Sequence, residues 1–271
     1  MFQITKPLPD GISMQGQTHY VNDSQIQFFA DNTFMRNGEQ ITEQEIFPHI
    51  FSLIANSTGF VLVDMFLFNA DYDENIVDKT IPITGNLTQH LIDRQTQNDS
   101  DIFVITDYLN TLYGSYEDVH FEAMRNAHIP VVKTRLDVLR DSNPLYSTFY
   151  RLVLQHLTFL EHISLPHPLG VTNEQTTLSH FFTLLNFKAN HRKILVTQEH
   201  GTYHTFITSA NPHEASSLHS NIGFHIQNSI AQDVLESERA ILQLSSTYTF
   251  DIEPVQQTTG NIGVTFLTEK K

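Results

Sequence analysis

Apolar and polar positions alternate along the chain with two periods, and each period predicts its own kind of element. Short apolar runs predict strands at Ile26–Ala30, Phe60–Phe68, Asp101–Asp107, Ile129–Thr134, Ile222–Ile226 and Ile262–Leu267. Apolar residues at three- and four-residue spacing predict helices at Glu43–Ala55, Glu117–Ala127, Glu174–Leu185 and Ala231–Leu242. Strands and helices therefore follow one another, which predicts an α/β sandwich with a mixed β-sheet flanked by helices.

Local signals place the start of two of these helices. Thr42 is expected to cap the first helix, with Glu45 at the capping-box position. Asn173 is expected to cap the helix at Glu174–Leu185. The stretch Arg135–Gly170 is punctuated by prolines and is expected to form a loop with one helix that shapes a pocket. No linker rich in Gly, Pro or Ser separates the elements, so we expect one domain over residues 1–271.

Composition limits the chemistry. The chain has 271 residues, 40% of them hydrophobic, and no cysteine, which excludes disulfides, thiolate nucleophiles and cysteine zinc sites. Asp plus Glu number 30 against 15 Lys plus Arg, a formal charge of −15. Binding to a nucleic-acid backbone depends on clustered cations, so we expect nucleic acid to be a disfavoured partner.

Other patterns bear on location and on metals. The first residues lack the charged-then-apolar order of a signal peptide. The run Phe60–Phe68 contains Asp64 and is too short to cross a bilayer, and the amphipathic stretch Phe149–Leu165 is broken by charged residues. We therefore expect no transmembrane segment and a cytoplasmic protein, which can still lie peripherally at a membrane. The histidines match no compact zinc spacing, so we expect neither a metal nor a cofactor.

The most informative segment is a predicted hairpin. The β-prone runs Asn190–Thr197 and Thr205–Asn211 flank a polar loop with Gly201 at its centre. Successive strand residues alternate between the two faces of a sheet. His191 and Lys193 therefore point the same way.

Ser209 and Asn211 share a face on the second strand by the same rule. If the hairpin is symmetric about Gly201, His191 lies across from Asn211 and Lys193 across from Ser209. An imidazole, an ammonium, a hydroxyl and a carboxamide would then converge. This set suits a phosphodiester, because imidazole can attack phosphorus while the other groups stabilise charge on the non-bridging oxygens.

These residues resemble the signature of the phospholipase D superfamily, a His-x-Lys strand followed by a Ser-x-Asn strand. In this chain the motif reads His191-Arg192-Lys193, then Thr208-Ser209-Ala210-Asn211 and the continuation Pro212–Asn221. The resemblance is to bacterial phospholipase D-like proteins of the cardiolipin synthase type, and in particular to their N-terminal half.

The resemblance implies a phospholipase D-like α/β sandwich that carries one such motif. It implies phosphodiester hydrolysis or phosphatidyl transfer on phospholipids through a phosphohistidine intermediate, without a metal. His191, Lys193 and Asn211 are the implied catalytic residues. Ser209 and His219 are the implied substrate contacts.

The chain departs from the family pattern in two respects that matter for activity. The acidic residue expected after the His-x-Lys motif is Gln198, and a second acidic residue, expected near the end of the motif, is Gly223. Family sites also use two motifs, one histidine as nucleophile and the other as general acid, whereas this chain has one. We therefore expect either a homodimer or a second phospholipase D-like half to complete the site.

Two alternatives remain open at this stage. One is a nuclease or nucleic-acid end-processing phosphodiesterase of the same superfamily, which a local basic groove would favour. The other is a non-catalytic phospholipase D-like half that needs a partner half, which the residues at Gln198 and Gly223 favour.

Overall fold

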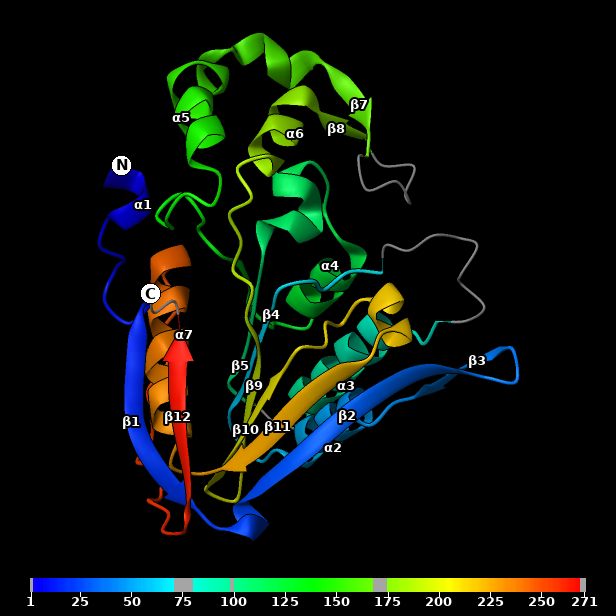
Figure 1. Ribbon diagram of the computed structural model, residues 1–271, viewed down its shortest axis with the longest axis vertical. Helices are drawn as coiled ribbons and strands as arrows, with labels where there is room; N and C mark the ends of the chain where they lie inside the picture. The colour runs from blue at the N-terminus through cyan, green and yellow to red at the C-terminus, as the bar shows by residue number, and fades with distance from the viewer. Residues whose placement is uncertain (1, 71–79, 98–99, 168–174, 269–271) are drawn as a thin grey trace.

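The computed structural model describes residues 2–70, 80–97, 100–167 and 175–268, arranged around an eight-stranded sheet (Figure 1). The strand order is β3-β2-β11-β10-β9-β4-β5-β6. These strands span Ile26–Arg36 (β2), Glu39–Glu43 (β3), Val61–Met65 (β4), Ile102–Thr106 (β5), Val131–Lys133 (β6), Lys193–Glu199 (β9), Thr202–Thr208 (β10) and Asn221–Gln227 (β11). Strands β4, β5 and β6 are parallel, and the other neighbours are antiparallel. The predicted mixed sheet is confirmed.

Helices and two short ribbons surround the sheet. The α-helices span Phe2–Thr5 (α1), Ile46–Asn56 (α2), Ile83–Gln97 (α3), Val119–Asn126 (α4), Pro144–Leu152 (α5), Leu178–Leu184 (α6) and Ala231–Ser245 (α7). Short 3-10 segments span Asp23–Gln25 (η1), Tyr108–Gly114 (η3), Leu154–His156 (η4), Thr158–His162 (η5) and Glu214–Leu218 (η6). The ribbons pair Met14–Val21 (β1) with Ile262–Thr268 (β12), and Ser164–Pro166 (β7) with Gln175–Thr177 (β8).

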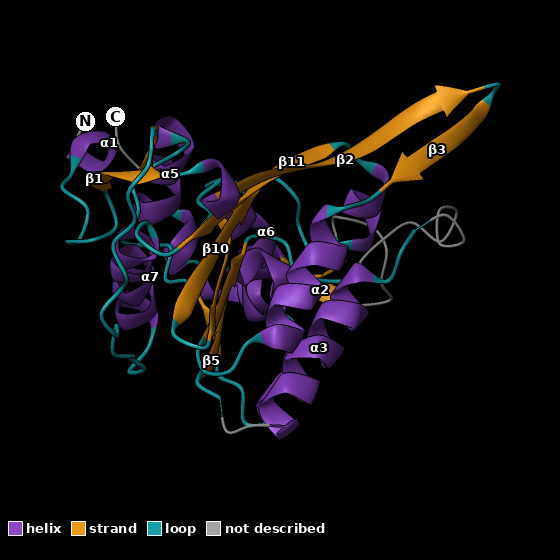
Figure 2. Ribbon diagram, turned by 90° about the horizontal axis from the view of Figure 1, so that it is seen from below, coloured by secondary structure: helices purple, strands orange, loops and turns teal. Residues whose placement is uncertain are grey.

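The two sheet faces are covered by different elements (Figure 2). On one face α2, α3 and α4 pack over Val63, Leu195 and Phe206. On the other face α7 and the β1–β12 ribbon pack over Leu62 and Val196. Neighbouring residues of β4 thus enter opposite cores, and all five residues of this strand are buried. Helices on both faces of the sheet confirm the predicted sandwich.

A third group of elements lies beyond one end of the sheet. Figure 1 shows α5, α6 and the β7–β8 ribbon together above the ends of β4 and β5. The expectation of a loop with one helix in Arg135–Gly170 is confirmed in outline, since α5 is followed by 3-10 turns and β7. Residues 168–170 of this stretch lie outside the described residues.

The cap predicted for α2 is wrong. Thr42 belongs to β3, and the helix begins at Ile46. The free amides at its start are bound by Asp31 of β2, whose Oδ1 accepts from the backbone N–H of Glu45 at 2.8 Å and of Ile46 at 3.1 Å. Asp31, which is distant in the sequence, therefore caps the N-terminus of α2 in place of a local residue.

The cap predicted for α6 also requires correction. The helix begins at Leu178, and Thr177 is its N-cap, with Oγ1 accepting from the His180 amide. Asn173, the residue expected to cap it, lies outside the described residues. Helix α3 was not predicted, although Ile83, Leu87 and Leu91 recur at four-residue spacing and are fully buried or nearly so.

No helix within residues 2–70, 80–97, 100–167 and 175–268 is long and apolar enough to cross a membrane. The single domain over residues 1–271 stays a prediction.

Candidate active site

The hairpin of β9 and β10 exists, but its register differs from the predicted one. The two strands are antiparallel neighbours that pair Thr202 with Glu199 and Ile207 with Ile194. The prediction of symmetry about Gly201 is therefore wrong by one residue. His200 has φ of 47° and Gly201 has φ of 82°, so both are the central residues of a two-residue turn, and the hairpin axis falls between them.

A one-residue change of register moves side chains to the other face. Lys193 shares a face with Leu195 and Phe206, which pack under α2, α3 and α4. Ser209 comes directly after β10 and alternation places it on the same face as Ile207, which packs with the opposite core. The predicted pairing of Lys193 with Ser209 is therefore wrong.

His191 and Lys193 lie side by side at the start of β9. Lys193 pairs with Met65, the last residue of β4, so both residues stand at the sheet edge where the parallel strands end. The Lys193 ammonium is 3.1 Å from the His191 carbonyl oxygen and 3.4 Å from its Nδ1. His191 is exposed, whereas Lys193 is buried, with 6% of its surface accessible.

Phe66, directly after β4, holds this pair from the other side. Its ring centroid lies 4.6 Å from that of His191 and 5.1 Å from the Lys193 ammonium. The ring face stabilises the cation and covers it from solvent. The backbone N–H of Phe66 donates to the Arg192 carbonyl oxygen at 2.9 Å, which fixes the ring against the strand.

Burial sets the protonation of the two groups. It lowers the pKa of Lys193 from 10.5 to about 8, and the charge of Asp64 opposes that change. The pKa of His191 is lowered by burial and by the Lys193 charge. At neutral pH the lysine is therefore charged and the imidazole neutral, which is the form that can act as a nucleophile.

Asn211 joins the site through the loop after β4. Its Oδ1 accepts from the backbone N–H of Leu67 at 3.2 Å, next to Phe66. Within the part of the chain that the structure describes, its amide nitrogen has no partner and can donate to a ligand. The structure thus brings His191, Lys193 and Asn211 together around Phe66–Leu67.

The segment after Asn211 is anchored to α3. Glu214 is buried and accepts from the Thr84 amide at 3.2 Å and from its hydroxyl at 2.7 Å. That hydroxyl also lies 2.9 Å from the Pro212 carbonyl oxygen. His213 contacts Asn69 Oδ1 at 2.8 Å. These contacts fix the loop that carries Asn211.

Ser209 and His219 do not join the group. The Ser209 hydroxyl donates to Asn221 Oδ1 and accepts from the Ile222 amide, both at 3.1 Å, at the start of β11. His219 is exposed beside the same strand, where its carbonyl oxygen accepts from Asn221 Nδ2 at 3.3 Å. Neither side chain contacts His191 or Lys193 in the described residues. The roles predicted for them stay without structural support.

Sequence reasoning missed Asn190, which organises the base of the site. Its side-chain amide donates to both carboxylate oxygens of Asp64 at 2.9 Å and to Thr134 at 3.0 Å. Its backbone N–H donates to Asp107 at 2.7 Å. Asp107 also caps η3, and burial raises its pKa to about 6. Asn190 thereby ties β9 to the ends of the three parallel strands.

A buried carboxyl pair lies below this residue. Burial and the nearby Glu238 raise the pKa of Asp64 well above its usual range. Glu238 Oε1 accepts from Arg192 at 2.8 Å, and the Arg192 charge opposes the rise in the pKa of Asp64. The Arg192 guanidinium thus offsets charge on this buried carboxyl pair. The middle residue of the motif, Arg192, is structural.

The two missing acidic residues have structural explanations. Gln198 lies near the other end of β9 from Lys193 and donates to Glu253 at 2.8 Å. A Cβ at Gly223 would lie 2.7 Å from Cε1 of Phe206, so any side chain there would displace a core ring. The sheet packing requires glycine at this position.

The histidines far from the site form a chain on the face under α2. His225 Nε2 lies 2.9 Å from His204 Nδ1, and His225 Nδ1 lies 3.2 Å from His49 Nε2. In the described residues no group of three His, Asp or Glu side chains is placed to hold a metal ion.

Comparisons with known proteins give structural likeness alone. No protein-family model and no curated protein matches the sequence. Among solved structures, the chain is similar to Nuc from Salmonella typhimurium, a phospholipase D family member (14% identity, covering 82% of this chain and 95% of that chain, TM-score 0.43). It is also similar to NucT from Helicobacter pylori (8% identity, 81% and 98% covered, TM-score 0.42).

Yeast tyrosyl-DNA phosphodiesterase is a third match (6% identity, 75% and 32% covered, TM-score 0.31). The chain therefore spans about a third of that protein's length. None of these comparisons supports the expectation that nucleic acid is a disfavoured partner. At these TM-scores the matches carry no argument about the reaction, which has to come from the site itself.

Proposed function

We propose that the chain is a phosphodiesterase of the phospholipase D type, with His191 as nucleophile. The observation that carries the proposal is the pairing of an exposed imidazole with a buried ammonium 3.4 Å away. Burial and then the ammonium lower the pKa of the imidazole and favour its neutral form, and the ammonium supplies the positive charge that a phosphodiester anion requires. His191 is exposed at this sheet edge, and Lys193 lies buried beside it.

The first step transfers the phosphoryl group to the protein. A ring nitrogen of His191 attacks phosphorus, a P–N bond forms and the P–O bond to the leaving group breaks. The leaving alkoxide takes up a proton. In the second step water or an alcohol attacks phosphorus and breaks the P–N bond, which gives hydrolysis or transfer and returns the imidazole.

Lys193 and Asn211 hold the phosphate in both steps. The Lys193 ammonium offsets charge on the non-bridging oxygens, and the Asn211 amide nitrogen donates a hydrogen bond to them. The Asn211 oxygen is already fixed by the Leu67 amide, so its nitrogen has a set direction. Such preorganisation lowers the reorganisation that the transition state requires.

The proton for the leaving group comes from a second motif in this proposal. Among the described residues the contacts of the His191 ring are with Lys193 and Phe66, neither a carboxyl group nor a second imidazole touches it, and the ring is exposed. A homodimer or a second phospholipase D-like half would bring another histidine to this open side. General acid catalysis contributes about 10²–10⁴-fold, so an isolated motif should be slow.

A phospholipid is the substrate favoured by the resemblance of the motif. A nucleic-acid phosphodiester is the second candidate, because a basic pocket lies on the same sheet edge. Its lining includes the cations Lys6, Arg135, Arg151 and Lys188 and one carboxylate, Asp137, which pairs with Arg135. Local positive charge of this kind can hold a polyanion despite the formal charge of −15.

Trapping the intermediate tests the proposal. The protein is mixed with bis(4-nitrophenyl) phosphate, quenched in alkali and digested, and the peptide containing His191 is analysed by mass spectrometry. We expect a base-stable, acid-labile phosphoryl adduct on His191 that His191→Gln lacks. A matched variant, His219→Gln, should keep the adduct. Turnover without an adduct would refute the mechanism, and absence of both would favour a non-catalytic half.

Parallel assays on phosphatidylcholine vesicles and on single-stranded DNA separate the two substrates. Light scattering on the same samples gives the oligomeric state. Full activity in a strictly monomeric sample would refute the need for a second motif.

A further inference from the structure

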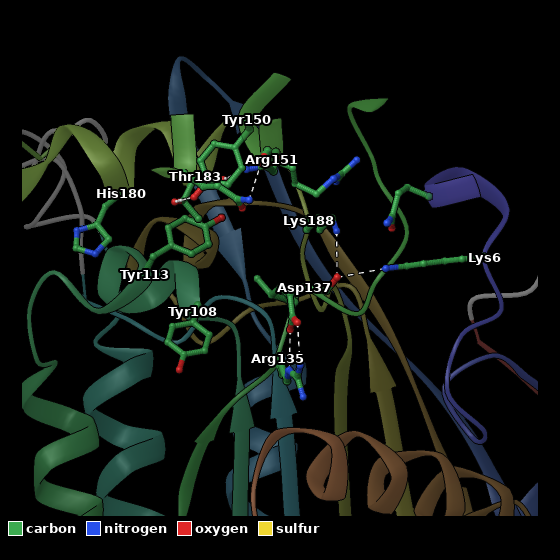
Figure 3. Close-up of a pocket in the computed structure, with 14 residues that line it drawn as sticks. Lys6, Tyr108, Tyr113, Arg135, Asp137, Tyr150, Arg151, His180, Thr183 and Lys188 are labelled. Atoms are coloured by element: carbon green, nitrogen blue, oxygen red, sulfur yellow. Dashed lines mark hydrogen bonds and ion pairs between the residues drawn. The ribbon is translucent and has the colours of Figure 1, made fainter. Parts of the chain in front are cut away.

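A cavity of about 650 Å³ lies on the same sheet edge as the candidate site but uses none of its residues. Its floor is formed by residues that follow β5 and β6, and its far wall comes from α5 and α6 (Figure 3). The carboxyl ends of parallel strands are the usual place for ligands in α/β folds. The volume lies within the range that holds a small organic ligand.

Positive charge collects on one side of this cavity. The ammonium groups of Lys6 and Lys188 lie 3.3 and 3.4 Å from the same carbonyl oxygen, that of Asp137. Figure 3 shows the two side chains reaching this point from different directions. Lys188 also donates to the Leu139 carbonyl oxygen at 2.9 Å and lies 3.2 Å from Asp141, whereas within the described residues the Lys6 ammonium has only a carbonyl oxygen as its acceptor. The pKa of Lys6 is lowered by burial and by the Lys188 charge.

Nearby carboxylates offset only part of this charge, because Asp137 pairs with Arg135 and Asp141 pairs with Arg151 and Lys188. Asp141 is buried and accepts two bonds from Arg151, at 2.8 and 2.7 Å, and lies 3.2 Å from the Lys188 ammonium. One carboxylate therefore serves two cations. Within the described ranges Lys6 has no carboxylate at ion-pair distance. In a chain with a formal charge of −15, this excess is local and specific.

Aromatic rings face the cations across the cavity. Figure 3 shows Tyr113 between Tyr108 and the Tyr150–Thr183 pair. Tyr150 and Thr183 join α5 to α6 through hydroxyls 2.8 Å apart. Tyr113 has φ of 60°, a left-handed conformation that is costly for this residue and that places its ring at the cavity.

We propose that this cavity is a nucleotide-binding site. The phosphate binds the Lys6 and Lys188 ammonium groups, and the base stacks on Tyr113. A phosphate satisfies the excess positive charge, and an aromatic base matches the ring wall in the same cavity. The cavity shares no lining residue with His191, Lys193 or Asn211, so AMP binding and phosphodiesterase activity are tested by separate measurements.

Isothermal titration calorimetry with AMP, adenosine, ribose 5-phosphate and inorganic phosphate tests the proposal. We expect AMP to bind most tightly, with adenosine and ribose 5-phosphate each at least about tenfold weaker, because each lacks one of the two contacts. His191→Gln should bind AMP as the wild type does. Equal affinity for AMP and adenosine, or no binding of AMP at millimolar concentration, would overturn the proposal.

Two variants separate the contacts. Lys6→Gln should weaken AMP and ribose 5-phosphate alike by about tenfold. Tyr113→Leu should weaken AMP by about tenfold but leave ribose 5-phosphate unchanged. Arg36→Gln removes one exposed cation elsewhere and is the matched control. If it weakens AMP as much as Lys6→Gln does, the attraction is only the general charge of the chain, and the site is refuted.

Discussion

Replacing Lys193 by methionine should make the protein more stable and inactive at once. Burial lowers the pKa of the ammonium from 10.5 to about 8. Each unit is worth about 1.4 kcal/mol, so the charged lysine costs the folded state about 3 kcal/mol. Only 6% of the residue is accessible, so solvent screens little of this cost.

The gain in the free energy of unfolding is reduced by the favourable contact that Lys193 makes in the wild type. Lys193→Met loses the hydrogen bond to the His191 carbonyl oxygen, worth about 1 kcal/mol. Methionine keeps the apolar contact with Phe66. We therefore expect the free energy of unfolding at pH 7 to rise by about 2 kcal/mol. The rate of phosphodiester cleavage should fall by about 10²–10³-fold, because the charge that stabilises the transition state is gone.

The pH dependence distinguishes this reasoning from simple repacking. The folded state loses the Lys193 proton near pH 8 and the unfolded chain near pH 10.5. Between these values the unfolded state binds more protons, so wild-type stability rises with pH and the advantage of the variant shrinks. Below pH 8 the buried Lys193 charge lowers the free energy of unfolding by its full amount.

Urea unfolding at pH 7 and pH 10 measures both effects. Lys133→Met is the matched control, because the Lys133 ammonium lies 3.8 Å from Glu117 and its removal should not stabilise the fold. A Lys193→Met protein that is less stable than wild type at pH 7 would refute the burial argument. So would an advantage that is the same at pH 7 and pH 10.

Three further predictions follow from the contacts. Asn211→Asp keeps the oxygen that accepts from the Leu67 amide but loses the amide donor. The kcat on bis(4-nitrophenyl) phosphate should therefore fall about 10²-fold, with little change in Tm. An unchanged kcat would contradict the role of Asn211 as a phosphate donor. Ser209→Ala should leave that kcat within error, since the hydroxyl serves β11, and a large loss would restore the role predicted from the motif. Burial lowers the pKa of His225 to about 3. As the pH drops, His225 is therefore protonated in the unfolded chain before it is protonated in the folded protein. The free energy of unfolding should fall between about pH 6.5 and pH 3. His225→Gln should flatten that loss in acid urea titrations, and parallel curves would show that the histidine chain is not its source.

The shared edge of the two sites gives them a structural connection. Lys188 lies in the cavity, and the chain then passes through Asn190 to His191 and Lys193. Asn190 is fixed by Asp64 and Asp107, so this short segment has a rigid anchor between the two sites.

The sequence by itself determined the class of fold and the hairpin that carries the motif. Apolar periodicity is a local property, so the strands around Val61–Met65 and Ile102–Thr106 and the helix at Ala231–Ser245 could be located without tertiary information. The residue types His191, Lys193 and Asn211 indicated phosphoryl chemistry for the same reason. The chemistry of an imidazole, an ammonium or a carboxamide is a property of the side chain and can be recognised from the sequence.

Only the tertiary structure decided how those residues meet. The positive φ of His200 moved the hairpin register by one residue and separated Ser209 from Lys193. Asp31 replaced the expected cap of α2 from a distant strand. The lowered pKa of Lys193 exists because Phe66 and the core bury it. Register, distant capping and burial depend on contacts between segments far apart in the chain, which local patterns do not encode.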